Sequence, residues 1–133
     1  MTGDLRLGFV ALSVPDVAAT CDFYRRAFGL EVRFVDPSGH FAELVTGAAR
    51  LAVVDDGFAE RQAGLAHRRT TPDGPPPGVV CTFFTTDVDA AVDRAIAAGA
   101  TLTRAPFDAP WGQRIAVVRD GDGALVELAT PVD

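Results

Sequence analysis

The side chains able to do chemistry are few and scattered along this sequence. It contains two histidines, His40 and His67, two cysteines, Cys21 and Cys81, and a single tryptophan, Trp111. There is no lysine, so no side chain can form a Schiff base with a carbonyl substrate. Each cysteine falls within an apolar pattern, and we interpret both as small buried hydrophobic residues rather than a disulfide or a redox pair.

Trp111 stands in the segment Ala109-Pro110-Trp111-Gly112-Gln113-Arg114, just ahead of a predicted strand. One interpretation makes it a core or dimer-interface aromatic, because tryptophan buries a large area. The other makes it the stacking wall of a ligand cleft, with Gln113 or Arg114 giving a directed hydrogen bond. Side chains alternate along a strand, so only one of Gln113 and Arg114 can face that cleft.

Composition limits the classes of protein to which the chain can belong. It has 133 residues, 48% of them hydrophobic, which is enough to bury the core of one compact domain. The net charge of -6 disfavours nucleic acid as a partner. No apolar run reaches membrane-spanning length, and the N-terminus lacks the order of a signal peptide. We therefore expect a soluble cytoplasmic protein without a membrane partner.

The first half of the chain reads as one strand, one helix and three more strands. Residues 5–14 alternate, with Val10, Leu12 and Val14 on one face and Phe9, Ala11 and Ser13 on the other. Pro15 and Asp16 begin a helix that ends at Gly29. An apolar stripe at helical spacing follows that helix: Val17, Cys21, Tyr24 and Phe28. Three further strands are predicted at 31–36, 41–46 and 50–54.

The second half repeats this order after a break. Residues 55–78 hold a short predicted helix at 58–66 and a proline-rich stretch that cannot continue a helix or a central strand. Thr86 is predicted to cap a helix ending at Gly99. The predicted strands are 79–85, 101–106, 113–119 and 124–130. We expect a single α+β domain over 1–133, built from two tandem βαβββ modules at about 5–56 and 78–131 and joined by a linker at about 57–77.

These features resemble the vicinal oxygen chelate superfamily, which includes glyoxalase I, extradiol dioxygenases, fosfomycin resistance enzymes and bleomycin-resistance-type binding proteins. The resemblance runs from Leu7-Gly8-Phe9-Val10 through Phe23-Tyr24 and Gly29-Leu30 to Trp111-Gly112-Gln113-Arg114 and Asp120-Gly121-Asp122-Gly123-Ala124-Leu125-Val126-Glu127. It implies the glyoxalase/bleomycin-resistance fold, in which two modules form a curved mixed sheet around a cleft.

The resemblance also implies four positions at which the enzymes hold a divalent ion, usually through His or Glu. In this chain they fall on Phe9, Ala52, Val80 and Glu127. Three are apolar, and a single carboxylate cannot hold a catalytic metal. His40 and His67 lie in a predicted turn and in the linker. We therefore expect no metal, no cofactor and no catalytic residue.

Apolar residues in place of the metal ligands would leave an apolar cleft suited to a planar ligand. The Trp-Gly-Gln-Arg element resembles that of drug-binding members of the superfamily. The predicted ligand-binding residues are Phe9, Phe41, Ala52, Val80, Phe84, Trp111, Gln113, Arg114 and Glu127. Phe9 and Val80 can also be interpreted as plain packing residues. Glu127 is interpreted either as a ligand contact or as a carboxylate hydrogen-bonded to a neighbouring strand.

The function that this predicts is non-catalytic binding and sequestration of an aromatic or polycyclic natural product, in antibiotic self-resistance, by a homodimer. One alternative is a metal-dependent lyase, isomerase or thiol transferase with an unusual ligand set. A second is a metal-free enzyme in which Glu127 acts as the general base.

Overall fold

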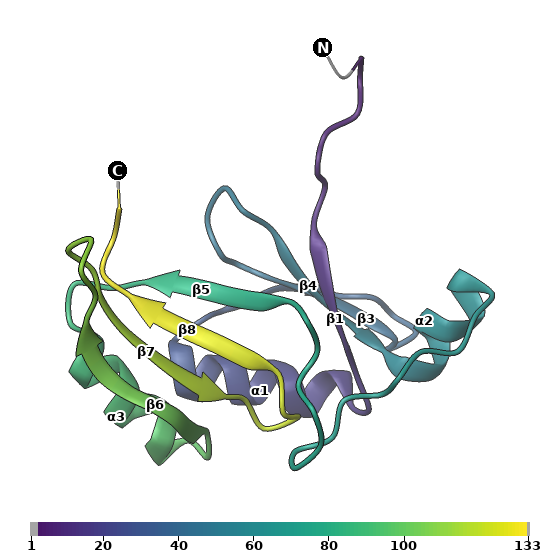
Figure 1. Ribbon diagram of the computed structural model, residues 1–133. Helices are drawn as coiled ribbons and strands as arrows, with labels where there is room; N and C mark the ends of the chain where they lie inside the picture. Colours follow the sequence, from purple (N-terminus) through teal and green to yellow (C-terminus); the bar gives the residue numbers. More distant parts are fainter. Residues whose placement is uncertain (1–2, 133) are drawn as a thin grey trace. The chain divides into compact units, whose positions relative to one another are not determined.

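The computed structural model describes residues 3–132, which form an α+β structure of two like modules (Figure 1). Module one consists of β1 (Val10–Val14), α1 (Val17–Phe28), β2 (Val32–Val35), β3 (Phe41–Leu44) and β4 (Leu51–Asp55). Its strands form one mixed sheet in the order β1-β4-β3-β2. β1 is parallel to β4, and the other two pairs are antiparallel.

Module two repeats this topology. It consists of β5 (Val80–Phe84), α3 (Val88–Ala97), β6 (Thr101–Asp108), β7 (Arg114–Arg119) and β8 (Leu125–Ala129). Its sheet has the order β5-β8-β7-β6, again with one parallel pair, β5 and β8. The tandem βαβββ prediction is confirmed. α2 (Asp56–Ala63) follows β4 directly and has no counterpart after β8 among the described residues.

By their contacts the residues divide into two compact units. Among the described residues, the first unit holds 3–21 together with 30–69, and the second holds 22–29 together with 70–132. The end of α1 therefore belongs to the second unit. β1 to β4 and α2 lie in the first unit, and β5 to β8 with α3 lie in the second.

The core of the first unit lies along its two central strands. Ala42, Leu44 and Val53 are almost fully buried. Glu43 is also buried, with 1% of its surface exposed, and its carboxylate lies 2.6 Å from Arg50 Nη2 and 3.0 Å from Arg33 Nε. Burying a carboxylate is costly unless it is paired, so these two arginines make its position on β3 tolerable.

The core of the second unit is organised around Tyr24. This side chain is fully buried, and its Oη donates a 2.5 Å hydrogen bond to Asp120 Oδ2. Asp120 Oδ1 accepts from the backbone N–H groups of Asp122, Gly123 and Ala124, which closes the turn between β7 and β8. Burial, followed by the charge of Asp120, raises the pKa of Tyr24 well above 10, so the phenol remains a donor at neutral pH.

The C-terminal ends of α1 and α3 each accept hydrogen bonds from an arginine of the other helix. Arg26 Nη1 donates to the carbonyl oxygen of Ala98 at the end of α3. Arg94 donates in turn to the carbonyl oxygens of Arg26 and Arg25 near the end of α1. The last carbonyls of a helix have no partner within it, so guanidinium groups at both ends satisfy them and complement the helix dipoles.

Several element boundaries depart from the sequence expectations. α2 spans Asp56–Ala63 rather than 58–66, because Asp55 caps it and Gly64 ends it. β1 begins at Val10 rather than at residue 5, because its neighbour β4 begins at Leu51, the register partner of Val10, and offers no earlier pairing. The cap of α3 is Asp87 rather than Thr86, since the Asp87 side chain accepts from the N–H of Ala90. β6 continues to Asp108, because Pro106 lies in an edge strand at a register shift, where a missing N–H is harmless.

Candidate functional site

The first unit contains a pocket of about 920 Å³ between the exposed face of its sheet and the segment after β4. One wall comes from β1 and the residue before it, through Phe9, Ala11 and Ser13. This is the face that the alternation of the strand predicted. The opposite wall is formed by α2 and the residues that follow it, up to His67. Phe41 of β3 and Val54 of β4 complete the apolar lining.

Aromatic rings dominate the apolar part of this pocket. Phe9 and Phe41 meet edge to face, with their centroids 5.5 Å apart and their planes inclined by 61°. Phe34 lies behind Phe41 at 5.9 Å. Phe58 of α2 also lines the pocket and stacks on His40, with centroids 5.4 Å apart. Such rings offer faces and edges on which a planar aromatic guest can stack.

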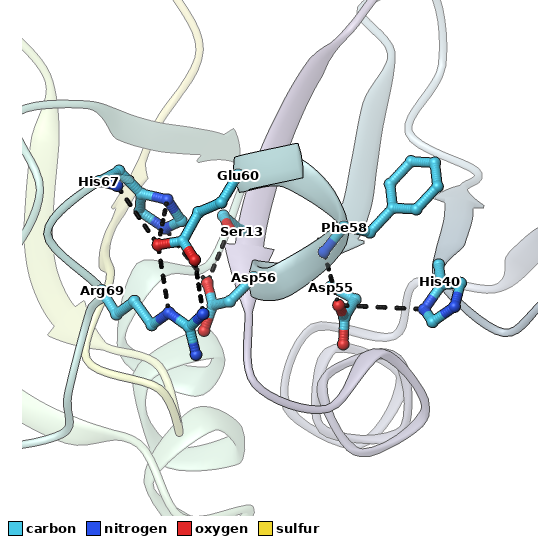
Figure 2. Close-up of polar contacts among 8 residues, drawn as sticks. All are labelled: Ser13, His40, Asp55, Asp56, Phe58, Glu60, His67 and Arg69. Atoms are coloured by element: carbon cyan, nitrogen blue, oxygen red, sulfur yellow. Dashed lines mark hydrogen bonds and ion pairs between the residues drawn. The ribbon is translucent and has the colours of Figure 1, made fainter. Parts of the chain in front are cut away.

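One end of the pocket is polar, and Figure 2 shows how its side chains are connected. Ser13 Oγ donates a 2.6 Å hydrogen bond to Asp56 Oδ1, and Asp56 is 3% exposed. The His67 ring lies between two carboxylates, with Nε2 3.3 Å from the same Asp56 oxygen and Nδ1 3.4 Å from Glu60 Oε2. Arg69 closes the group through a 2.5 Å contact to Glu60 Oε1.

The charge of Glu60 is fixed by that arginine. The hydrogen bond from Arg69 lowers the pKa of Glu60 from 4.5 to about 2, with a smaller contribution from the backbone N–H of His67. Glu60 is therefore ionised at any physiological pH, and the segment after α2 is attached to that helix by an ion pair.

A second polar edge lies in the turn between β2 and β3. Asp36 and Ser38 both line the pocket. Ser38 donates both its hydroxyl, at 2.6 Å, and its backbone N–H, at 3.0 Å, to Asp36 Oδ2. These bonds lower the pKa of Asp36 below its ordinary value, so the carboxylate is charged at neutral pH.

The start of α2 explains how the wall is positioned. Asp55 caps the helix by accepting a 2.8 Å hydrogen bond from the N–H of Phe58, and it also lies 3.9 Å from His40 Nδ1 (Figure 2). Gly64 ends the helix in a left-handed conformation with φ of 71°. Since β4 ends at Asp55 and α2 begins at Asp56, no loop separates them, and the helix contacts β4 and β1.

Three of the predicted ligand-binding residues belong to the first unit. Phe9 and Phe41 come together in the pocket. Ala52 is fully buried on β4, paired with Ala11 on one side and Glu43 on the other, so it lies on the same face of the sheet without lining the pocket.

Val80, Phe84 and Glu127 belong to the sheet of the second unit. Val80 and Phe84 are 47% and 55% exposed on β5, which is an edge strand. Thr82 lies between them on the same face of β5 and donates its hydroxyl to Glu127 Oε1 at 3.3 Å. Thr82 and Glu127 are also register partners. Glu127 is thus hydrogen-bonded to the neighbouring strand β5, as expected if it is a structural carboxylate rather than a ligand contact.

Trp111, Gln113 and Arg114 lie in the same unit, at the start of β7. Trp111 is 67% exposed, and its Nε1 donates to Gln113 Oε1 at 2.8 Å. Gln113 Nε2 donates to the carbonyl oxygen of Thr130 at 2.6 Å. Arg114 is paired with Asp89 on α3 and with Asp108, each at 3.0 Å, and these contacts raise its pKa. Its guanidinium is therefore directed to the helix side of the sheet.

The residues at the four implied metal positions do not fit a divalent ion. Phe9, Ala52 and Val80 have no lone pairs to offer, and Glu127 is the single donor among the four. Within residues 3–132 no group of three or more His, Cys, Asp and Glu side chains has an arrangement that could hold a metal. The thiols of Cys21 and Cys81 are free, and burial raises the pKa of both.

Most residues that line the pocket were not predicted from the sequence as site residues, among them Ser13, Phe58 and His67. Asp56, which contacts Ser13 and His67, was not predicted either. Ser13 shared the face of Phe9, and that alternation was a usable signal. The other three lie in or beside the segment that was interpreted as a linker. No local pattern indicates that a short helix there folds back on the sheet, because that depends on the long-range contacts of Asp56.

Comparison with known proteins decides the family. A family model described as the glyoxalase/bleomycin resistance protein/dioxygenase superfamily matches residues 6–128. The chain belongs to this superfamily. An uncharacterised protein of Mycobacterium bovis is 35% identical over 127 residues, which cover 91% of this chain and 80% of that relative. An uncharacterised protein of Mycobacterium tuberculosis H37Rv is also 35% identical and is covered over 72% of its length.

Solved structures agree with the fold of this superfamily member. A glyoxalase-related enzyme from Fulvimarina pelagi superposes with a TM-score of 0.82 at 22% identity, covering 95% of this chain and 88% of that one. A family enzyme from Burkholderia phytofirmans PsJN gives 0.81 at 24%, covering 96% and 100%. TioX from Micromonospora sp. ML1 gives 0.72 at 27%, covering 93% and 97%. No helix among the described residues is long and apolar enough to cross a membrane.

Proposed function

We propose that this chain binds and sequesters a planar aromatic or polycyclic natural product without changing it chemically, and that it serves in antibiotic self-resistance. The observation that carries the proposal is the pocket of the first unit, in which Phe9, Phe41 and Phe58 form aromatic walls. Ligand pockets are typically about 300–1,000 Å³, mostly apolar and furnished with a few polar groups. The volume of about 920 Å³ and the polar groups at its edge match that description.

Sequestration removes a toxin by mass action, so it needs affinity and no reactive group. The two histidines, which would be the ordinary acid-base residues, are both directed at carboxylates rather than free to serve a substrate. The family's metal positions hold one donor, Glu127, which is too few for a Lewis acid site. These features support a binding protein over the metal-dependent alternative.

The proposal includes a homodimer. β1 and β5 are each at the edge of their sheet, and both carry exposed apolar residues, including Val10 on the first and Val80 and Phe84 on the second. Unpaired apolar edges favour association with another chain. For the second unit, Val80, Phe84, Trp111, Gln113 and Glu127 remain predicted ligand contacts. Of the pair at 113 and 114, Gln113 is kept, because the ion pairs of Arg114 with Asp89 and Asp108 direct that side chain to the helix side of the sheet.

Equilibrium dialysis against a panel of tricyclic and tetracyclic aromatic antibiotics tests the proposal. We expect at least one compound to bind with one equivalent per chain and to be recovered unaltered by mass spectrometry. Phe41→Ala removes a ring that lines the pocket and should weaken binding about tenfold or more, since a stacked ring contributes about 0.5–1.5 kcal/mol beyond its buried area.

Phe34→Ala is the matched control, because Phe34 contacts the Phe41 ring but does not line the pocket. It should leave the affinity within about twofold. Equal losses in the two variants, or conversion of the compound to a new product, would contradict the proposal.

A further inference from the structure

The polar groups of the pocket differ in which hydrogen-bonding role they have left to offer. Five polar side chains line it: Ser13, Asp36, Ser38, Gln62 and His67. Each hydroxyl has one hydrogen to donate and two lone pairs that accept, whereas an ionised carboxylate only accepts. The direction of each existing bond therefore determines what remains for a ligand.

Both hydroxyls have already given away their hydrogen. Ser13 Oγ donates to Asp56 Oδ1 at 2.6 Å, and Ser38 Oγ donates to Asp36 Oδ2 at 2.6 Å. Neither carboxylate can return a hydrogen bond while it is ionised. Ser13 therefore presents only acceptor lone pairs to the pocket, and Ser38 shares its lone pairs with the N–H of His40.

His67 offers no free donor either. Its Nε2 lies 3.3 Å from Asp56 Oδ1 and its Nδ1 lies 3.4 Å from Glu60 Oε2 (Figure 2). Both ring nitrogens are thus directed at carboxylates. Among the lining side chains of this described pocket, Gln62 alone retains donors that are not directed at a carboxylate.

Most charged side chains near the pocket are carboxylates, which also accept hydrogen bonds and do not donate them. Asp36 lines it, and Asp55, Asp56 and Glu60 stand at the start and along one side of α2. Of the arginines nearby, Arg69 is bound to Glu60, and the guanidinium carbon of Arg61 lies 6.0 Å from the centroid of the Phe58 ring. An anionic guest would meet carboxylates, which repel it, and hydroxyls whose hydrogen is already donated, which cannot replace the hydrogen bonds it loses from water.

We infer that the ligand of this pocket is a planar aromatic that carries hydrogen-bond donors and a positive charge, such as a protonated aromatic amine, with Ser13 and Asp36 as the acceptors that select it. This rests on the proposed function and specifies the chemical class of the ligand. The ring system lies against Phe9, Phe41 and Phe58, and the donor groups point to one or both polar edges.

Two fluorescent probes of equal ring number test this inference. Proflavine is a planar three-ring cation with amino donors, and anthracene-9-carboxylate is a planar three-ring anion that only accepts. We expect the protein to bind proflavine at least about tenfold more tightly, because charge-assisted hydrogen bonds are about twice as strong as neutral ones. Phe41→Ala should weaken the binding of both probes.

Asp36→Asn removes the charge while keeping the shape and the bonds from Ser38. It should lower the affinity for proflavine by roughly threefold to tenfold, because the amide oxygen still accepts a hydrogen bond but a charge-assisted bond is about twice as strong as a neutral one. Asp93→Asn makes the same charge change at an exposed position on α3 of the second unit and should have no effect.

The outcomes separate the two proposals. If both probes bind through Phe41 but the anion binds as tightly as the cation, or if Asp36→Asn has no effect, the inference is overturned and the proposed function stands. If neither probe binds, or if binding is indifferent to Phe41, both are overturned.

Discussion

Asp120 organises the tight turn between β7 and β8. One carboxylate oxygen satisfies three backbone N–H groups, and the other accepts from Tyr24. Asp120 is only 5% exposed, so water cannot replace a bond that is lost. The Tyr24 hydroxyl is therefore a structural donor that connects α1 to the turn between β7 and β8.

Tyr24→Phe should lower the free energy of unfolding by about 1–3 kcal/mol, because it leaves a buried carboxylate oxygen without its O–H donor. Urea denaturation monitored by circular dichroism measures this. Thr103→Val is the control, since it removes an exposed hydroxyl bond to the carbonyl oxygen of Val117 and should cost less than about 0.5 kcal/mol. Equal effects in the two variants would show that the Asp120 bond is not special.

Residue by residue, the sequence predicted the candidate site in part. Phe9 could be placed because strand alternation fixes which side chains share a face. Phe41 was predicted as a ligand-binding residue, but the register of its strand could not be fixed from the sequence. Their partners on α2 could not be placed, because the position of that helix depends on Ser13 and His67 reaching Asp56 across the sequence. The orientation of Arg114 could not be predicted, because alternation permits its side chain to lie on either face of the sheet. Its ion pair with Asp89 of α3 places it on the helix side.

At the scale of elements, the two βαβββ modules could be predicted because each uses local signals that occur twice. A strand alternates, an acid begins a helix and a glycine ends it. α2 was predicted at about the right place, yet its role as a wall of the pocket was not. That role comes from the Asp55 cap and from the ion pair between Glu60 and Arg69, neither of which has a recognisable sequence spacing.

The Glu60–Arg69 pair makes the attachment of this wall dependent on pH. The pKa of Glu60 is lowered from 4.5 to about 2, so its stabilising contribution is fully present above about 4.5 and is lost as the pH falls through about 2. A carboxyl-detected NMR titration should place the Glu60 pKa near 2. In Arg69→Ala it should return towards 4.5.

The adjacent Arg68 provides the matched control for this titration. It is exposed, and its removal changes the net charge by the same amount. Arg68→Ala should leave the pKa of Glu60 near 2. A Glu60 pKa close to 4.5 in the unmodified protein would show that the pair is not formed in solution.

At the scale of the whole molecule, exposed apolar edges indicate an assembly. β5 is an edge strand flanked by Val79, which is 57% exposed, and an extended segment with exposed Leu5 and Leu7 precedes β1. We predict a homodimer, and sedimentation at micromolar concentration should give a species of twice the 14.0 kDa chain mass.

Val79→Lys should shift this equilibrium towards the single chain, since a charged residue blocks pairing at a sheet edge. Ile96→Lys is the control, because Ile96 is an exposed apolar residue on α3 and not at a sheet edge. Sedimentation of the unmodified protein as a 14.0 kDa species alone would rule the dimer out.

The central claim is that the pocket of the first unit holds an aromatic guest, and intermolecular nuclear Overhauser effects locate a bound guest directly. With a planar aromatic ligand bound at saturation, the account predicts effects between the ring protons of the ligand and the side chains of Phe9, Phe41 and Phe58. Effects confined to β5 and to the segment around Trp111 would contradict it, because the ligand would then occupy the second unit.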